Sequence, residues 1–163
     1  MLNGKKVLLI ITGGIAAYKS LELVRKLKEK GADVIPVMTK AAENFVTPMS
    51  VSALAQEKVY NKLFDLTDEA EMGHIELSRS SDLIVVVPAS ADFIAKTATG
   101  QANDLASTLI LATDTKVLMA PAMNVRMWEN PLTQKNIKIL HNNGVKFVGP
   151  DEGEMACGEF GFG

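Results

Sequence analysis

The sequence predicts a three-layer α/β sandwich, in which helices cover both faces of a mostly parallel β-sheet. The first observation is that short runs of branched apolar residues, such as KVLLII, alternate with longer amphipathic runs. Strands covered on both faces lack the regular apolar and polar alternation of half-exposed strands. The second is that residues typical of helix starts and stops separate these runs. Strands joined by helices imply right-handed crossovers and a parallel sheet.

Residues 5–12, KKVLLIIT, predict the first strand because they are almost uninterrupted by polar side chains and rich in branched ones. Residues 16–31 predict an amphipathic helix, with Leu21, Val24 and Leu27 along one side. Lysine and arginine crowd its last turn before a glycine, where cations complement the negative end of the helix dipole.

Residues 33–39 predict the second strand, and Thr47 followed by Pro48 is a usual start for a helix over residues 47–56. The same patterns predict the rest of the chain. Further strands are expected at residues 82–88, 116–121 and 145–150, and further helices at residues 91–100, 103–113 and 130–144.

The 163-residue chain has the composition of one globular domain, with 47% hydrophobic and 22% charged residues. A formal charge of -2 without a basic stripe argues against a nucleic-acid partner. A single cysteine excludes an intrachain disulfide and fits a reducing compartment. The longest early apolar run, residues 7–11, is too short for a signal or membrane segment. We therefore expect a cytoplasmic protein with no membrane partner and no metal site.

Four predicted strand ends carry small or polar residues: TGGIAA, MTKAAENF, PASADF and PAMN. In folds of this kind ligands bind at the carboxyl ends of strands. In TGGIAA a glycine turn enters a helix, so backbone N–H groups would face an anion. The turn is not the GxGxxG of dinucleotide sites, and a tight turn that binds nothing explains it equally well.

The end of the second strand distinguishes two nucleotide ligands. Dinucleotide sites usually place an acidic residue there to bind the ribose hydroxyls. This chain has Thr39 and Lys40, a hydroxyl and a cation that suit a phosphate. The sequence therefore favours a mononucleotide such as FMN over NAD, and Ser90 with its small neighbours would let a ring or phosphate approach the backbone.

Four residues are candidates for chemistry. His74 lies in a polar stretch before a strand, where a surface role is more typical than that of a base. His141 is explained as a cation near a helix end, and Asn124 equally as a cap of the next turn. Cys157 lies in residues 151–163, which have neither helical nor strand periodicity.

The surroundings of Cys157 indicate which chemistry its thiol would favour. Free cysteines are usually core filler, but this segment offers little core to fill. Glu154 and Glu159 lie close in the sequence and would oppose a thiolate. A thiol kept protonated in this way is a poor nucleophile and a possible acid. Residue patterns alone therefore lead to a phosphate-binding α/β domain with a cysteine-bearing loop.

PAMNVRMW (121–128) matches the PxMNxxMW signature of the flavin-dependent cysteine decarboxylases. GGIAAYK, HIEL, PASADFIAK and ACGEFGFG occur in the family's order, and the chain resembles the family from about residue 4 to its C-terminus. TGGIAAYK and ACG are similar to the branch that acts on 4'-phosphopantothenoylcysteine in coenzyme A biosynthesis. The resemblance implies a Rossmann-like (flavodoxin-like) fold and one FMN-binding decarboxylase domain over residues 1–163.

The resemblance also implies the roles of individual residues. His74 aligns with an active-site histidine that acts from a neighbouring subunit of a homotrimer. Asn124 aligns with the residue that binds the substrate carboxylate, together with Met127 and Ala156, and Cys157 aligns with the proton donor. Contacts to FMN are expected from Gly13, Gly14, Ile15, Ala16, Thr39, Phe45, Ala89, Ser90 and Met123.

The implied reaction converts 4'-phosphopantothenoylcysteine to 4'-phosphopantetheine. FMN transiently oxidises the cysteine thiol to a thioaldehyde with His74 as base, and carbon dioxide then leaves. Hydride from the reduced flavin and a proton from Cys157 complete the product. An amide at Asn124 stabilises the ground-state carboxylate less than arginine would. Water would be excluded by Met123, Met127 and Trp128, although a core role explains Trp128 as well.

Two positions depart from the family pattern. Asp92 stands where the family often has asparagine, and Asn103 stands where it often has aspartate. We hypothesise that the exchange preserves one hydrogen bond between the two side chains; otherwise Asp92 places a charge near the flavin or phosphate. Two alternative functions stay open, a non-catalytic FMN-binding regulatory subunit and a flavin prenyltransferase.

The chain ends in GEFGFG, where the family continues. In many bacteria the decarboxylase is fused to a phosphopantothenoylcysteine synthetase. We therefore expect the chain to be a truncated part of a longer protein, and such a synthetase domain to be a possible partner.

Overall fold

The computed structural model describes residues 1–63 and 70–163, with only the backbone described for residues 70–72 and 74. Its main sheet has five strands in the order β2-β1-β3-β4-β5, all paired in parallel. This is the strand order of flavodoxin-like folds, and it confirms the predicted fold class. The strands are β1 (Lys6–Ile11), β2 (Asp33–Met38), β3 (Leu83–Ala89), β4 (Val117–Pro121) and β5 (Lys146–Phe147).

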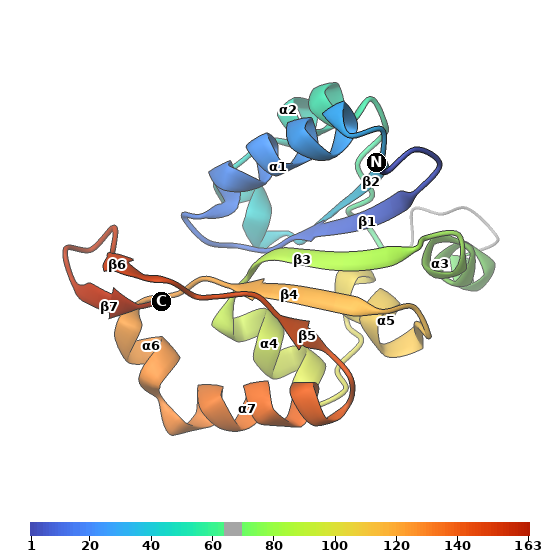
Figure 1. Ribbon diagram of the computed structural model, residues 1–163. Coiled ribbons are helices and arrows are strands. Elements are labelled where there is room, and N and C mark those ends of the chain that lie inside the picture. The colour runs from blue at the N-terminus through green and yellow to red at the C-terminus, as the bar shows by residue number, and fades with distance from the viewer. Residues whose placement is uncertain (64–69) are drawn as a thin grey trace.

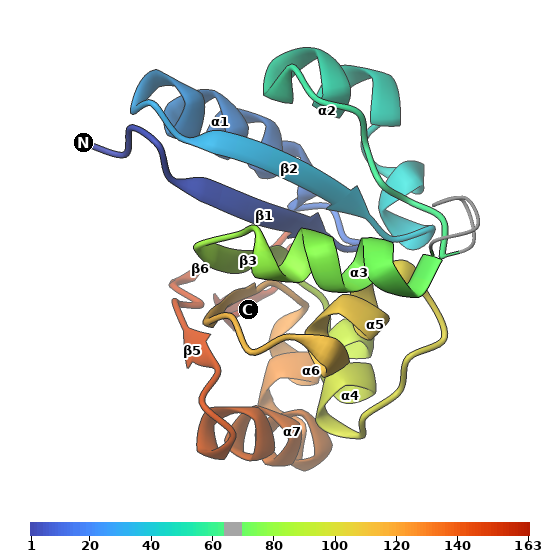
Figure 2. The ribbon, with the colours of Figure 1, turned by 90° about the vertical axis from the view of Figure 1, so that its right-hand side faces the viewer.

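Helices cover both faces of the sheet (Figures 1 and 2). Helices α1 and α2 lie on one face, and α4, α5 and α7 lie on the other. The helices are α1 (Ala17–Glu29), α2 (Pro48–Ala55), α3 (Ala70–Arg79), α4 (Ala91–Ala98), α5 (Leu105–Ala112), α6 (Val125–Glu129) and α7 (Pro131–Asn142), with a short 3₁₀ helix η1 (Ala41–Asn44).

Two hydrophobic cores, one on each face, follow from the period-two geometry of the central strand β1. Leu8 and Ile10 belong to the core that includes Phe93 of α4. Leu9 and its neighbours on the opposite face belong to the core that includes Val24 of α1. Burying such a side chain fully contributes about 1.5–3 kcal/mol, so these apolar runs account for the position of the strand in the middle of the sheet.

Several predicted helix signals are confirmed by their hydrogen bonds. The Thr47 hydroxyl accepts from the backbone N–H of Ser50 at 3.1 Å, and Pro48 begins α2. Pro131 begins α7, whose last turn contains His141. Among the described residues, none of the helices combines the length and apolar character needed to cross a bilayer.

The structure differs from the sequence prediction at four places. Residues 151–163, expected to be irregular, form an antiparallel hairpin of β6 (Glu152–Glu154) and β7 (Phe160–Phe162). Strands of three residues with a central glycine are too short to show a period. The five-residue helix α6 was likewise missed, the last strand is shorter than expected, and His74 lies on helix α3 instead of a polar connection.

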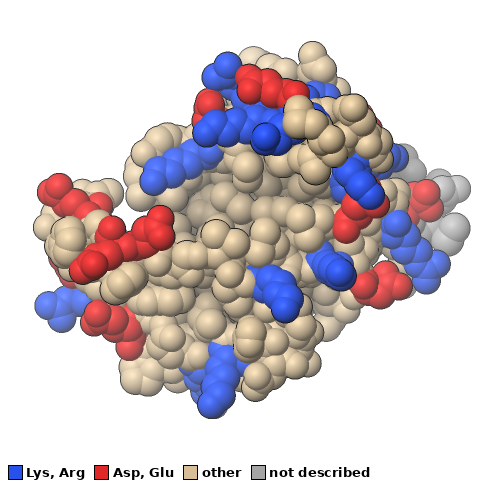
Figure 3. All heavy atoms as spheres, in the orientation of Figure 1, with Lys and Arg blue, Asp and Glu red and all other residues tan. Residues whose placement is uncertain are grey.

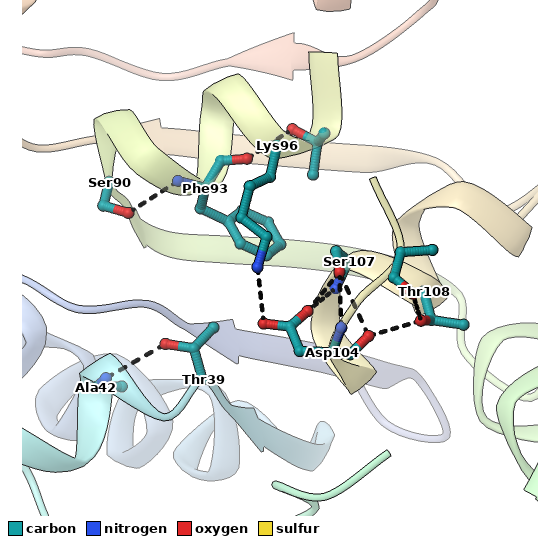
Figure 4. Close-up of polar contacts among 10 residues, drawn as sticks. Thr39, Ala42, Ser90, Phe93, Lys96, Asp104, Ser107 and Thr108 are labelled. Atoms are coloured by element: carbon teal, nitrogen blue, oxygen red, sulfur yellow. Dashed lines mark hydrogen bonds and ion pairs between the residues drawn. The ribbon is translucent and has the colours of Figure 1, made fainter. Parts of the chain in front are cut away.

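Helices α4 and α5 are joined by the carboxylate of Asp104 (Figure 4). The backbone N–H of Ser107 donates to Asp104 Oδ1 at 2.8 Å, and Lys96 Nζ lies 3.2 Å from Asp104 Oδ2. Burial alone would raise the pKa of the Asp104 carboxyl. The hydrogen bonds from the Ser107 hydroxyl and N–H, and the charge of Lys96, outweigh burial and lower the pKa below its ordinary value.

We predict that Asp104→Ala lowers the free energy of unfolding at pH 7 by about 1–2 kcal/mol, because α5 loses its N-cap. Folding lowers the Asp104 pKa, so the carboxylate stabilises the protein fully above its unfolded-state pKa of about 4. That contribution is lost as pH falls through the folded-state pKa. Urea unfolding measured from pH 7 to pH 3 should therefore show that the difference in unfolding free energy between wild type and variant becomes smaller as the pH falls.

Asp114→Ala is the matched control, because Asp114 is exposed beyond the end of the same helix. Its unfolding free energy should stay near that of the wild type. Equal losses in both variants would contradict the capping role of Asp104, and a difference independent of pH would contradict the contribution of its charge.

Candidate active site

A cleft of about 820 Å³ opens at the carboxyl ends of β1, β3 and β4. Strand β2, which follows β1 in the chain, pairs with one edge of β1, and β3 pairs with the other edge. The cleft therefore lies where the strand order reverses. Its walls come from the segments that follow these three strands, from Ala41 of η1 and from the β6–β7 hairpin. The volume is within the usual range for small-molecule and cofactor sites.

The turn after β1 forms one wall of the cleft. A side chain at Gly13 would clash, since its Cβ would lie 2.5 Å from the Cβ of Ala41 in η1. At Gly14 a Cβ would meet no atom of the described residues within 4 Å, so this glycine faces open space among them. In the described part of the chain, no side chain caps the first turn of α1, and that turn contains no acidic residue. The turn therefore offers backbone N–H groups to an anion, as the sequence predicts.

The buried Thr12 joins the ends of β1 and β3 beneath the cleft. Its hydroxyl donates to the carbonyl of Pro88 and accepts from the backbone N–H of Ser90 at 3.0 Å. The Ser90 hydroxyl in turn accepts from the N–H of Phe93 at 3.1 Å and caps α4 (Figure 4). These bonds fix the position of Ser90 in the cleft wall while its hydroxyl is used as a helix cap.

The expected FMN-contacting residues divide into two groups. Those that line the cleft are Gly13, Gly14, Ile15, Ala16, Ser90 and Met123. Thr39, Phe45 and Ala89 are not part of the described lining. Thr39 and Ala89 are buried, and the Thr39 hydroxyl accepts from the N–H of Ala42 at 3.2 Å (Figure 4). A direct contact of these three residues with a ligand stays a prediction.

Asn124 is the N-cap of α6 and also faces the cleft. Its Oδ1 accepts from the backbone N–H groups of Arg126 and Met127 at 2.8 and 3.3 Å, so it caps the helix. This pairing directs Nδ2 toward the hairpin, where it donates to Glu159 Oε1 at 3.0 Å and lies 3.6 Å from Cys157 Sγ. Asn124 is therefore both a helix cap and a residue of the cleft lining.

The structure brings the expected substrate-binding residues to the same part of the cleft. Asn124, Met127, Ala156 and Cys157 all belong to its lining, although they lie on α6 and on the hairpin. Cys157 is exposed, and its thiol donates to Glu159 Oε1 at 3.9 Å. An amide donor and a thiol thus meet beside apolar side chains, an arrangement suited to binding and protonating a small polar group.

Other expected residues are placed elsewhere. His74 is on α3, and its side chain lies outside the described residues. Trp128 is half-buried and does not belong to the described cleft lining, and His141 is exposed on α7. The hypothesised hydrogen bond between Asp92 and Asn103 is not found among the described residues, and both residues are exposed. Asp92 instead lines the cleft.

The cleft also contains residues to which the sequence assigned no role in a site. Tyr18, Lys19, Ala41 and Met155 line it, and Glu159, considered only as a charge near Cys157, contacts its lining residues. Lys19 was detectable as the last residue of the GGIAAYK motif, whereas Glu159 depends on a contact across 35 residues. Within the described part of the chain, no three His, Cys, Asp or Glu side chains gather as they would around a metal ion.

Charge is distributed unevenly around the cleft. Lys19 contributes a cation from the α1 wall, while Asp92 and Glu154 contribute anions from the walls of α4 and the hairpin. Figure 3 shows the surface hollowed beside the hairpin, with acidic side chains gathered along the hairpin's rim. An anionic ligand is therefore favoured at the α1 side of the cleft.

A family model described as Flavoprotein matches residues 1–163. The chain belongs to the Flavoprotein family. This membership confirms the resemblance to flavin-dependent proteins that the motifs indicated.

Similar proteins are found among curated sequences and solved structures. The chain is 52% identical over 162 residues to the Coenzyme A biosynthesis bifunctional protein CoaBC of Vibrio vulnificus (strain YJ016), covering 99% of this chain and 40% of that protein. The CoaBC of Escherichia coli (strain K12) is 49% identical over 162 residues, with coverage of 99% and 40%. The chain thus spans about 40% of the length of these curated relatives.

Two solved structures resemble the whole fold of this flavoprotein. The FMN-dependent cysteine decarboxylase SpaF has a TM-score of 0.86 at 26% identity, covering 99% of this chain and 91% of SpaF. A mutant PPC decarboxylase complexed with pantothenoylaminoethenethiol has a TM-score of 0.82 at 31% identity, covering 98% of this chain and 89% of that one.

We predict that Gly13→Ala lowers the free energy of unfolding by about 1–3 kcal/mol, the range for overpacking a close contact. The added methyl group would push the α1 turn away from η1, because Ala41 occupies the space it needs. Thermal unfolding of the protein as purified measures the effect. Gly14→Ala is the control, since its Cβ has no neighbour within 4 Å; equal destabilisation by both changes would contradict the close approach.

Proposed function

We propose that this domain binds FMN in the cleft and decarboxylates 4'-phosphopantothenoylcysteine to 4'-phosphopantetheine for coenzyme A biosynthesis. The observation that carries the proposal is the meeting of Asn124 and Cys157 in a cleft that also contains the uncapped turn of α1. The names of the similar proteins support it, because they include CoaBC, a PPC decarboxylase and an FMN-dependent cysteine decarboxylase.

The described cleft fits FMN in its chemistry. Residues 13–16 would hold the phosphate through backbone N–H groups, with Lys19 as a nearby cation. Ala122 and Met123 offer apolar surface to a flat ring, and Ser90 stands among small residues in the same lining. When bound, FMN would supply a two-electron acceptor and donor, which makes loss of the cysteinyl carboxylate possible.

The residues of the chain would then act on the substrate. Asn124 would bind the substrate carboxylate through Nδ2, whose direction is fixed because Oδ1 caps α6. A neutral amide stabilises this carboxylate in the ground state less than a permanent cation would, so it holds the group without opposing its departure. The Cys157 thiol would donate the proton that completes the product.

The apolar part of the lining would keep water from this step. Met123, Met127 and Ala156 surround the polar pair, and the hairpin forms the outer wall. Met127 is 48% exposed, so it has surface available to a substrate or to a neighbouring chain. Exclusion of water strengthens the hydrogen bonds made to the reacting group.

We predict that the purified protein supplied with FMN shows the yellow absorption spectrum of protein-bound flavin. It should release carbon dioxide when phosphopantothenoylcysteine is added. One 4'-phosphopantetheine should form for each carbon dioxide without an external reductant, because the electrons taken from the thiol are returned to the product. Absorption spectroscopy, a carbon dioxide assay and mass spectrometry of the product follow the three steps.

The diagnostic variant is Cys157→Ser, which should still release carbon dioxide but form the reduced product about 100-fold more slowly, since a general acid is lost. The oxidised enethiol should accumulate instead, up to one per bound FMN, because the two electrons taken from the thiol stay on the flavin. Protein that stays colourless with FMN would overturn the whole proposal. Bound FMN without carbon dioxide release would favour a regulatory subunit, and a modified flavin formed with a prenyl phosphate would favour a prenyltransferase.

We also propose that the domain works as a homotrimer or a multiple of trimers, in which His74 acts as base in a neighbour's cleft. The described lining contains no histidine, and α3 lies on the opposite side of the fold from the hairpin (Figure 1). Ile15, Tyr18, Phe45 and Met49 are large apolar residues that stay exposed. Such surface suits a subunit interface.

The assembly predicts a molar mass in solution of three times the 17.6 kDa chain, or a multiple of that value. Size-exclusion chromatography with light scattering measures this mass. His74→Asn should keep the mass and lose carbon dioxide release, and mixing it with an inactive Cys157→Ala, Asn124→Ala chain should restore activity if sites are shared. A monomer that is fully active would contradict the proposal.

The domain arrangement of the whole protein stays a proposal as well. The relatives are named bifunctional, and the chain covers about 40% of them. This supports a phosphopantothenoylcysteine synthetase domain as its partner in the longer protein. Location in the cytoplasm stays a prediction.

A further inference from the structure

Glu159 lies between the hairpin turn and β7, and its carboxylate is shared by three side chains. Its Oε1 accepts from Asn124 Nδ2 at 3.0 Å and from the Cys157 thiol at 3.9 Å. Its Oε2 lies 3.6 Å from Arg126 Nε. The side chain is only partly exposed, at 38%. One carboxylate thus connects both residues proposed to act on the substrate and links the hairpin to α6.

We propose that Glu159 is a positioning residue of the decarboxylase: its carboxylate keeps the Asn124 amide and the Cys157 thiol next to each other. This inference rests on the function proposed above. Glu159 neither bonds to the substrate nor transfers a proton to it in this scheme. It determines whether the proton donor on the hairpin lies beside the group that binds the carboxylate.

The hydrogen bonds of Asn124 show why an acceptor is needed at this position. Asn124 Oδ1 is already used by the two N–H groups at the start of α6, so the two hydrogens of Nδ2 face the hairpin and the cleft. Glu159 accepts from Nδ2 at 3.0 Å, and the other hydrogen points to Cys157 Sγ at 3.6 Å, a long contact that a substrate carboxylate would replace. A flipped amide would turn its oxygen toward the Glu159 carboxylate and leave the α6 N–H groups unpaired.

Among the described residues, the other contacts that hold the hairpin are close approaches of its backbone at Gly161 and Gly163. Its strands have three residues each, and Phe160 and Phe162 are exposed. The backbone of β7 packs directly on α6 at Gly161, where a Cβ would lie 2.6 Å from Val125 Cγ2. Small two-stranded hairpins are marginally stable alone, so the polar contacts of Glu159 carry much of the docking.

The test compares Glu159→Ala, Glu159→Gln and the control Glu152→Ala in the FMN-loaded protein. The glutamine variant keeps an oxygen that can accept from Asn124, whereas alanine removes it. Glu152 lies on the same hairpin, is exposed and does not line the cleft, so its loss changes the local charge without the contact. One readout is backbone amide exchange of residues 151–163, measured by mass spectrometry. The other is the ratio of oxidised enethiol to 4'-phosphopantetheine.

We predict that Glu159→Ala raises two quantities by about tenfold each: the rate of amide exchange in the hairpin, and the ratio of oxidised enethiol to 4'-phosphopantetheine. The reason is that the docked hairpin opens more often. Glu159→Gln should restore both values to within about threefold of wild type, and Glu152→Ala should match wild type. An unchanged ratio in Glu159→Ala, or equal effects of Glu159→Ala and Glu152→Ala, would overturn the inference.

The two readouts separate this inference from the proposed function. If wild type releases no carbon dioxide, the proposed function fails, and hairpin exchange still shows whether Glu159 docks the segment. If wild type is active and the alanine variant loosens the hairpin without changing the product ratio, Glu159 has a structural role only and the positioning role is wrong.

Discussion

Strand β1 is buried on both faces, and this burial leads directly into the cleft. Its residues alternate between the two hydrophobic cores up to Ile11, and the next residue, Thr12, is still buried. The Thr12 hydroxyl then binds both the carbonyl of Pro88 and the N–H of Ser90. The ends of β1 and β3 are tied there, and the chain turns away at the next residue, Gly13, where it lies close to η1. The shape of the cleft floor therefore depends on how β1 is packed.

The opposite wall follows from a second constraint, the capping of a five-residue helix by Asn124. Helix α6 is too short to be stable on its own propensity, so the hydrogen bonds at its start matter. The same pairing that satisfies the helix orients Nδ2 toward Glu159 and Cys157. A local structural requirement thus determines the direction of the side chain proposed to bind the substrate, and Glu159 accepts from its amide on that side.

The sequence predicted the parts of the fold that depend on local patterns. The apolar runs gave the main strands because burial on both faces leaves a continuous apolar signal, and Thr47–Pro48 marked a helix start. The hairpin was missed because EGE and FGF are too short for a period. Asn124 and Cys157 were found through family motifs, whereas Glu159 was considered only as a charge. Its role depends on a contact between segments far apart in the chain, which no local pattern reveals.

The uneven charge of the cleft favours different ligand groups on its two sides. The α1 wall offers N–H groups and Lys19, while Asp92, Glu154 and Glu159 lie on or beside the other walls. A ligand phosphate is favoured at the first side, and a carboxylate bound to Asn124 would lie close to Glu159. Repulsion between these two carboxylates weakens ground-state binding of the group that must leave, and it disappears when that group departs as neutral carbon dioxide. An acidic residue beside Asn124 is therefore compatible with carboxylate binding, because it opposes the ground state more than the transition state.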